Sequence, residues 1–439
     1  MEKGLPAHGE EMMIKRTHYA GQIDETLLGS QVRIAGWIED TRDIGKLAFV
    51  TIRDVTGICQ LVMTDQNLGL ALQSPRQSAV VVTGTVQKSK ARDFVVEVKV
   101  SEFALLSRAS NSLPIDPTGR VESGLDKRLD SRALDLRNPK VAAIFRLRSA
   151  GLEIVRNVLT SQGFIEVNTP KVIGSASEGG ANLFSFDYFG KRKAYLAQSP
   201  QLYKEQLMVG LDRVFEIGPY FRAEKSHTVR HLSEFISIDI EAAFLDYEDL
   251  MDILERLIKN VATKLHENHE ADLRAIGSKV ILVNEIERLT YEQCLEELAK
   301  EGEKLEFGDD LSDSALRKLG EFHPGFYFIM DWPLKLKPFY IHGKDDDPRL
   351  SKSFDLQYSY LELASGGRRM HDPAKLRNRL ADQGLNPASF EDHLKVFEWG
   401  MPPHSGWGLG YDRLIMVLTA SQNVRDVVLY PRDTERLTP

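Results

Sequence analysis

Two arginines and a histidine in the middle of the chain have the residue types that phosphate binding requires. Arg222 and Glu224 precede a polar loop, and Arg230 and His231 follow it, with strand-like alternation on both sides. Guanidinium groups bind phosphate oxygens in pairs and do not lose their charge, so this predicted hairpin could hold a polyphosphate. Alternatively, the same charges form ordinary ion pairs on a solvated hairpin.

Two carboxylates further along the chain could bind a hard cation. Asp355 and Glu362 are seven residues apart, and Mg²⁺ prefers oxygen ligands of this kind. One regular strand would place them on opposite faces, so a shared site requires a bulge or a turn between them. Taken singly, both could be surface acids. The denser run Asp345–Asp347 lies between a glycine and a proline, which predicts a solvated loop.

A glycine-rich segment near the C-terminus, Gly406–Gly410, precedes Arg413 and an apolar helix predicted over 414–419. Glycines allow a backbone to approach a ligand closely, and an arginine in the first turn of a helix can reach a phosphate. The segment lacks the preceding strand and distant acid of a dinucleotide-binding fingerprint, and no GxxxxGK[ST] motif occurs. Neither a Rossmann site nor a P-loop is expected.

Around these residues, the first 108 positions are expected to form a small β domain. Five runs rich in β-branched residues are separated by turns, over 32–34, 48–52, 60–63, 80–83 and 94–98. This number and spacing of strands is typical of an OB-fold β-barrel. Residues 1–108 carry 13 basic and 13 acidic side chains, whereas the whole chain has a net charge of −8. The N-terminal domain is therefore the better candidate for RNA binding.

The remaining residues are expected to form a hinge and one large domain. Residues 109–139 are rich in Ser, Pro and Asp, which predicts a hinge. Apolar residues at helical spacing predict helices over 141–162 and 247–268, and strand-like runs accompany them. Residues 140–439 are thus expected to fold as an α+β domain with a large antiparallel sheet flanked by helices.

Composition excludes several classes of protein. The 439 residues are 27% charged and 42% hydrophobic, which suits globular domains. The two cysteines, Cys59 and Cys294, form no CxxC pair and no zinc spacing, so a disulfide scaffold and a zinc ribbon are not expected. No apolar run approaches the ~20 residues that span a bilayer, and the N-terminal stretch is charged. These features predict a cytoplasmic protein with no membrane partner.

Taken in order, three segments resemble motifs 1, 2 and 3 of the class II aminoacyl-tRNA synthetases: Gly163–Pro170, Tyr220–Phe235 and Gly406–Arg413. The preceding OB barrel resembles the subclass that charges aspartate, asparagine or lysine. Over residues 17–439 the chain looks most similar to archaeal-type aspartyl-tRNA synthetases, through the strings Arg16–Tyr19, Leu129–Arg132, Ala197–Lys204, Gly400–His404 and Pro431–Asp433. The resemblance implies a ligase that activates aspartate with ATP and transfers it to tRNA(Asp).

The resemblance also implies which residues bind ATP and its metal ion. Arg222 would hold the α-phosphate and Arg413 the γ-phosphate, and both would be catalytic. Further ATP contacts would come from Glu224, Arg230, His231, Leu232, Phe235, Glu362, Gly410, Tyr411 and Asp412. The cofactor would be Mg²⁺, held by Asp355, Glu362 and Ser365.

For the amino acid, the family positions imply that Lys204 and Arg369 bind the side-chain carboxylate and that Asp239 meets the ammonium group. Other substrate contacts would be Glu178, Gln201 and Ser365. Asparaginyl enzymes usually lack the lysine, and lysyl enzymes would need acids there. The pocket is therefore expected to select L-aspartate.

For the tRNA, the resemblance places Phe49 and Gln60 on the central anticodon base, with Arg42 nearby. Phe49 could instead fill the barrel. Related enzymes that are strict for tRNA(Asp) tend to have a tryptophan where this chain has Glu39. This difference predicts that tRNA(Asn) is also charged with aspartate. Alternatively, Glu39 accepts a hydrogen bond from the amino group of cytosine in tRNA(Asp) and preserves the discrimination.

Motif 1 implies a homodimer with a two-fold interface. Two other functions remain open at this point, an asparaginyl-tRNA synthetase and a non-catalytic RNA-binding paralogue. The joint presence of Arg222, Glu224, Asp355, Glu362 and Arg413 favours an enzyme, because an inactive copy has no chemical reason to keep the phosphate and metal groups together.

Overall fold

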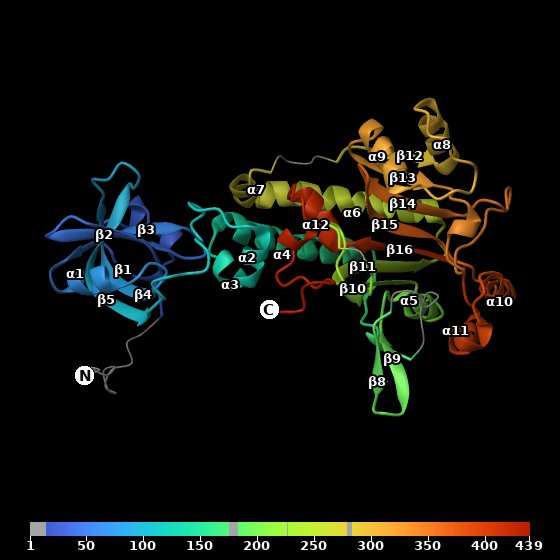
Figure 1. Cartoon of the computed structure of the whole chain (residues 1–439), viewed down its shortest axis with the longest axis horizontal. Coiled ribbons are helices and arrows are strands. Elements are labelled where there is room, and N and C mark those ends of the chain that lie inside the picture. The colour runs from blue at the N-terminus through green and yellow to red at the C-terminus, as the bar shows by residue number, and fades with distance from the viewer. Residues whose placement is uncertain (1–14, 175–182, 226, 279–282) are drawn as a thin grey trace. The chain divides into compact units, whose positions relative to one another are not determined.

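The computed structural model describes residues 15–174, 183–225, 227–278 and 283–439, and Glu178 lies outside these ranges. The chain divides into two compact units, residues 1–139 and 140–439 (Figure 1). In the described part of the chain, no helix combines the length and apolar character needed to cross a membrane.

The first unit contains the predicted barrel. Five strands close it in the order β1-β2-β3-β5-β4. Their bounds are β1 Gln31–Asp43, β2 Leu47–Arg53, β3 Ile58–Thr64, β4 Ala79–Lys88 and β5 Val96–Ser107. Each predicted run overlaps one strand, because inward positions such as Ala48, Val50 and Ile52 alternate with outward ones and form the barrel core. Helix α1, Asp65–Gln73, lies between β3 and β4 and was not predicted.

The segment expected as a hinge contains two short helices of the first unit, α2 Leu125–Asp130 and α3 Arg132–Asp135. Asp135 accepts hydrogen bonds from Arg128 at 3.1 Å and from Arg132 at 2.7 Å. These buried and half-buried charge pairs fix the end of the segment just before the second unit begins.

The second unit is built on an eight-stranded sheet in the order β12-β13-β14-β15-β16-β11-β10-β6 (Figure 1). The strands are β6 Ile165–Glu166, β10 Arg213–Phe221, β11 Glu234–Ala243, β12 Glu287–Thr290, β13 Phe326–Met330, β14 Ser353–Tyr358, β15 Leu361–Arg368 and β16 His404–Gly410. Neighbours are antiparallel except at the two ends, where β12–β13 and β10–β6 are parallel. The predicted large antiparallel sheet is therefore confirmed.

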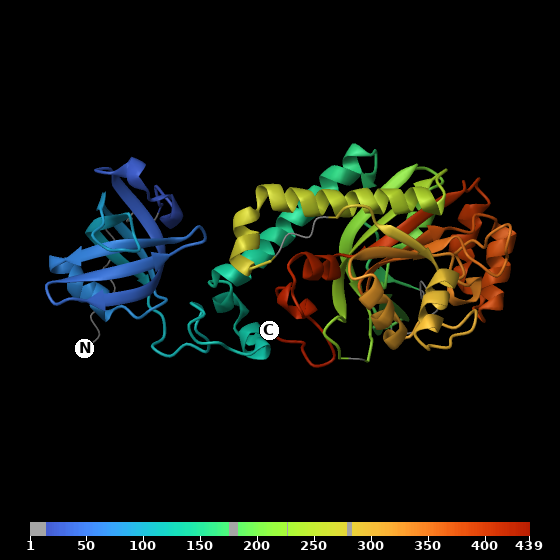
Figure 2. The ribbon, with the colours of Figure 1, turned by 90° about the horizontal axis from the view of Figure 1, so that it is seen from above.

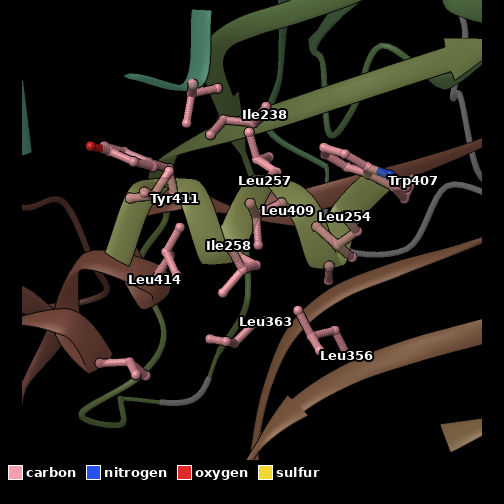
Figure 3. Packing of buried hydrophobic residues seen from close by; sticks show 14 of the residues in the cluster. Ile238, Leu254, Leu257, Ile258, Leu356, Leu363, Trp407, Leu409, Tyr411 and Leu414 are labelled. Carbon is pink, nitrogen blue, oxygen red and sulfur yellow. The ribbon is translucent and has the colours of Figure 1, made fainter. Parts of the chain in front are cut away.

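Two long helices, α4 Pro139–Ser161 and α6 Tyr247–Asn268, provide the main cover of this sheet (Figure 2). The predicted bounds of the second helix are those observed. Its buried residues Leu254, Leu257 and Ile258 pack with Ile238 of β11 and Leu409 of β16 (Figure 3). Because side chains alternate along a strand, the residues between these apolar ones point to the other face of the sheet.

Smaller elements complete the unit. A three-stranded sheet has the order β7-β9-β8, with β7 Val172–Ile173, β8 Ser185–Tyr188 and β9 Arg192–Leu196. The other helices are α5 Gln201–Leu207, α7 Glu270–Ile276, α8 Tyr291–Lys300, α9 Asp313–Phe322, α10 Pro373–Asp382, α11 Glu391–Phe397 and α12 Tyr411–Leu418.

Candidate active site

A cavity lies on the sheet face that α4 and α6 leave open. Its empty volume is about 1120 Å³, including the mouth where it meets solvent. Ser237 and Asp239 of β11, Ser365 of β15, and Gly408 and Gly410 of β16 line it. Their strand neighbours are in the core, so the alternation of the strands produces both the core and the cavity wall.

Positive charge gathers at one end of the cavity. The lining includes Arg222, Glu224, Arg230, His231 and Arg413, which the sequence placed in two separate motifs. Arg413 donates to the Glu362 carbonyl oxygen at 2.8 Å and to the Arg230 carbonyl oxygen at 3.3 Å. The structure thus brings the hairpin and the C-terminal arginine together.

The electrostatics of this end suit an anion. Burial lowers the pKa of Arg413, and the nearby charges of Arg222 and Arg230 lower it further, although Glu362 opposes them. Burial and the Arg413 charge likewise lower the pKa of His231. Crowded cations that lower each other's pKa bind an anionic group favourably, because the anion relieves their repulsion.

The side of the cavity next to these cations is apolar. Phe235 and Leu232 line it, and the Arg222 guanidinium carbon lies 5.3 Å from the centre of the Phe235 ring. The ring and the guanidinium provide flat surfaces against which a planar base can stack.

Two of the residues expected to contact ATP, Tyr411 and Asp412, have side chains that bond to other parts of the protein. Tyr411 is fully buried in the core, does not line the cavity, and donates its hydroxyl to the Arg148 carbonyl oxygen at 2.5 Å. Asp412 reaches the cavity wall, but its carboxylate accepts from the Ile236 amide at 2.8 Å and pairs with Arg148 at 2.5 Å. The helical turn thus points the Tyr411 side chain into the core, and contact of Tyr411 and Asp412 with ATP stays a prediction.

The predicted metal residues lie on the hairpin of β14 and β15. Asp355 is opposite Ser365 and Gln357 is opposite Glu362, with a bulge between Leu356 and Gln357. Two strands joined by a turn therefore carry the two carboxylates. A shared cation site requires a bulge or a turn between Asp355 and Glu362, and the structure has both.

The charges of this hairpin fit a cation. Lys337 donates to Asp355 Oδ2 at 2.7 Å, whereas Asp355 Oδ1 is buried without a hydrogen-bond partner. Loss of bulk water raises the pKa of Glu362, which lies in the cavity wall, and the Asp355 charge raises it further. The described residues contain no cluster of three or more His, Cys, Asp or Glu with metal-binding geometry. A cation here would therefore need further oxygens from a ligand or from water.

The opposite end of the cavity has buried ion pairs. Gln201, Asp239 and Arg369 line it, but Lys204 lies just behind the wall, 2% exposed. Lys204 Nζ donates to Asp239 Oδ1 at 2.9 Å and is 3.6 Å from Glu241 Oε2. The structure therefore places Lys204 next to Asp239 and not at the cavity surface.

Glu241, and its pairing with the glycines of β16, were not predicted from the sequence. Glu241 is fully buried and accepts from Arg369 Nε at 2.9 Å. Gly406 is opposite Glu241 and Gly408 is opposite Asp239. A Cβ on Gly406 would lie 2.1 Å from Glu241 Oε2, and one on Gly408 would lie 3.0 Å from Asp239 Oδ1. Alternating glycines on β16 therefore make room for alternating carboxylates on β11, a signal that the sequence contains.

The first unit brings the predicted anticodon residues onto the outside of the barrel. Phe49 is opposite Arg42, and Thr51 is opposite Gln60. Phe49 is half-buried and absent from the barrel core, so it does not fill the barrel. Gln60 Nε2 donates to Glu97 Oε2 at 2.8 Å.

Glu39 lies at a bulge of β1, between Ile38 and Asp40. Arg53 donates to both carboxylate oxygens of Glu39. Its Nε donates to Oε2, and its Nη2 donates to Oε1 at 3.0 Å. Only 12% of the Glu39 side chain is exposed. The carboxylate is thus directed to a neighbouring strand.

Comparisons with known proteins agree with this geometry. The family model of class II tRNA synthetases (D, K and N) matches residues 124–434, and that of the OB-fold nucleic acid binding domain matches 32–106. An aspartate–tRNA(Asp/Asn) ligase of Methanothermobacter thermautotrophicus is 45% identical, covering 97% of this chain and 99% of the relative. An aspartate–tRNA(Asp) ligase of Pyrococcus horikoshii is 43% identical, covering 97% and 100%.

A solved structure is also similar over nearly the full length. The asparaginyl-tRNA synthetase from Pyrococcus horikoshii complexed with asparaginyl-adenylate has a TM-score of 0.91 and 32% identity, covering 97% of this chain and 100% of that one. The cation-rich cavity, the outward-facing barrel residues and the family matches converge on one conclusion: this chain belongs to the class II tRNA synthetases of the D, K and N group and is an aminoacyl-tRNA synthetase.

Proposed function

We propose that this synthetase is an aspartate–tRNA ligase of relaxed tRNA specificity. It activates L-aspartate with ATP and transfers the aspartyl group to tRNA(Asp) and to tRNA(Asn). The curated relatives of 45% and 43% identity are both named aspartate ligases, one for tRNA(Asp/Asn) and one for tRNA(Asp).

The observation that carries the choice of amino acid is the pair Lys204–Asp239. The ammonium group of aspartate can take the place of Lys204 as the partner of Asp239. Lys204 Nζ then becomes available to the side-chain carboxylate of the same molecule, with Arg369 beside it. Every buried charge keeps a partner, which matters because an unpaired buried charge costs several kcal/mol. Asparagine brings no carboxylate at that end and leaves Lys204 with only Glu241, which is 3.6 Å away and already bonded to Arg369.

The chemistry proceeds in two steps. An α-carboxylate oxygen of aspartate bonds to the α-phosphorus of ATP, the bond from that phosphorus to the bridging oxygen breaks, and pyrophosphate leaves. A hydroxyl of the terminal ribose of tRNA then bonds to the aspartyl carbonyl carbon and loses its proton, and AMP leaves. Arg222 and Arg413 line the cavity and stabilise the negative charge of the first step.

Magnesium is the cation that we assign to Asp355 and Glu362. The unsatisfied Oδ1 of Asp355 and the raised pKa of Glu362 are the features that a dication would relieve, and Ser365 is opposite Asp355. Two protein carboxylates with phosphate and water oxygens suit Mg²⁺. When bound, Mg²⁺ supplies positive charge for the phosphates of ATP.

For the tRNA, we propose that Phe49 stacks on an anticodon base, with Arg42 and Gln60 on the same outer face of the barrel. Stacking of this kind contributes about 1–3 kcal/mol per base. The hydrogen bond that Arg53 donates to Glu39 occupies the carboxylate that would otherwise accept from the exocyclic amine of cytosine. The third base, C in tRNA(Asp) and U in tRNA(Asn), is then read weakly.

We further propose that residues 1–108 form the anticodon-binding domain, 109–139 the hinge and 140–439 the catalytic domain. Strand β6 ends the large sheet and its two residues are exposed, which supports a homodimer formed through α4 and β6. We expect the enzyme in the cytoplasm, where its tRNA substrates are.

Amino-acid-dependent exchange of labelled pyrophosphate into ATP tests the proposed function. Aspartate, asparagine and lysine are each supplied alone with Mg²⁺. We expect exchange with aspartate only. Preference for asparagine would identify an asparaginyl enzyme, and no exchange with any of the three would support a non-catalytic RNA-binding protein.

A further inference from the structure

A buried glutamate behind the amino-acid end of the cavity has no role in the reaction described above. Glu205 is on α5, four residues after Gln201, and is fully buried. Gln201 lines the cavity, and its Nε2 is 2.7 Å from Glu205 Oε1. Gln201, which lines the cavity, is therefore hydrogen-bonded to Glu205, which does not line it.

This contact fixes the orientation of the Gln201 amide. An ionised carboxylate only accepts hydrogen bonds, so the atom of Gln201 that faces Glu205 must be the nitrogen. The carbonyl oxygen Oε1 is left as the polar atom that Gln201 offers to the cavity. A neutral partner that can both donate and accept would leave either orientation available.

The surroundings of Glu205 keep it ionised. Burial alone raises the pKa of Glu205, but the adjacent imidazole of His404 and the charge of Arg369 are among the neighbours that outweigh burial and lower it. His404 Nε2 is 3.6 Å from Glu205 Oε2, and both side chains are fully buried. Ionised Glu205 can only accept from Gln201.

We infer that Glu205 is a positioning residue that holds Gln201 as a hydrogen-bond acceptor toward the amino acid. Aspartate has two carboxylates, which only accept, so its ammonium group is the donor that matches Gln201 Oε1. Glu205 thus helps the pocket to recognise the α-amino group, acting through Gln201. This inference rests on the proposed use of aspartate.

The variant Glu205→Gln tests the inference because it keeps the shape and removes the charge. In pyrophosphate exchange we expect the KM for aspartate to rise about tenfold, the usual effect of weakening one hydrogen bond to a charged group. The KM for ATP should stay within about twofold. Succinate lacks the amino group, so its inhibition constant against aspartate should also change less than about twofold.

Glu97→Gln is the matched control. Glu97 is a buried glutamate that accepts from the Gln60 amide in the first unit, so its loss should leave the KM for aspartate unchanged. Gln201→Met adds a second measurement that does not depend on the folding of the Glu205 variant. It should raise the KM for aspartate and spare succinate, and combining it with Glu205→Gln should add no further increase.

An unchanged KM for aspartate in folded Glu205→Gln would overturn the inference. Equal weakening of aspartate and succinate would also overturn it, because that result indicates general damage to the pocket. If the unmodified enzyme shows no aspartate-dependent exchange, the proposed function itself fails, so the two failures are distinguishable.

Discussion

Lys204 is the buried cation between two carboxylates, because its Nζ bonds Asp239 at 2.9 Å and is 3.6 Å from Glu241. The string Ala197–Lys204 predicts that Lys204 belongs to the amino-acid pocket, but it does not predict the bond to Asp239. The two residues are 35 positions apart and meet only because α5 packs against β11. Motifs identify which groups take part, whereas the pairing of buried charges depends on tertiary packing.

We predict that Lys204→Met loses aspartate activation and also destabilises the fold. Asp239 and Glu241 would lose a buried cation, and breaking such a pair typically costs about 3–5 kcal/mol. Urea unfolding and pyrophosphate exchange measure the two effects. Lys344→Met, which breaks the 2.7 Å pair with Asp331 outside the cavity lining, is the control and should keep aspartate activation. A KM for aspartate within about threefold of the unmodified enzyme would remove Lys204 from the pocket.

Asp355→Asn should reduce adenylate formation by about 100-fold or more, because the variant loses a charged oxygen ligand for Mg²⁺. High magnesium should restore part of the rate as water replaces the lost ligand. Asp345→Asn, in the solvated loop, should behave like the unmodified enzyme. Normal exchange by Asp355→Asn at low magnesium would contradict the assignment.

At the scale of elements, the periodicity of apolar residues predicted the long helices and most strands, but it did not predict the short helix α1. Helix α6 has the predicted bounds because ten of its residues form one buried stripe. The turn that a shared site of Asp355 and Glu362 requires is present, because Ser359 and Tyr360 form a turn between β14 and β15. The glycine-rich segment 406–410 lies in strand β16, and its glycines face the carboxylates of β11.

That pairing of glycines and carboxylates predicts a large effect for Gly406→Ala. The new Cβ would overlap Glu241 Oε2 and the Ile240 carbonyl oxygen, at 2.1 and 2.4 Å. We expect a loss of about 1–3 kcal/mol of stability, with weaker aspartate binding as Arg369 loses its partner. Gly210→Ala, where a Cβ meets no atom within 4 Å, is the control. Equal unfolding midpoints for the two variants would show that the glycine is not required.

His323, at the end of helix α9, contacts one glutamate of strand β12 and one of helix α8, and the stabilisation from these contacts depends on pH. His323 lies 2.8 Å from Glu287 and 2.9 Å from Glu297. Burial lowers the pKa of His323, but the bonds to the two glutamates outweigh burial and raise it. Its folded pKa thus exceeds the unfolded value of about 6.5. The stabilisation is fully present below that pH and disappears as pH rises through the folded pKa.

Replacing His323 by Gln should therefore matter most in acid. We expect the difference in melting temperature between the unmodified and His323→Gln proteins to be largest near pH ~6 and to shrink by pH ~9. Calorimetric scans across this range measure it. A difference that does not change with pH would show that the imidazole is not charged in the folded protein.

For the whole molecule, the charge distribution constrains how RNA is bound. The chain has a net charge of −8, so it has no overall attraction for a polyanion. Recognition of tRNA is therefore expected to use local groups, for which we propose Arg42 and Phe49 on the barrel. The boundary between the two units lies at residue 139, at the end of the segment that was predicted as a hinge. The bond between Glu39 and Arg53 was not predictable, because it depends on a bulge in β1.

The most direct test of the proposed ligase is aminoacylation of purified tRNA(Asp) and tRNA(Asn) transcripts with labelled aspartate. With Glu39 held by Arg53, we expect kcat/KM for the two transcripts to agree within about tenfold. Labelled asparagine should be transferred to neither. A preference for tRNA(Asp) above ~100-fold, roughly 2.7 kcal/mol, would contradict relaxed specificity, and transfer of asparagine would contradict the aspartate ligase itself.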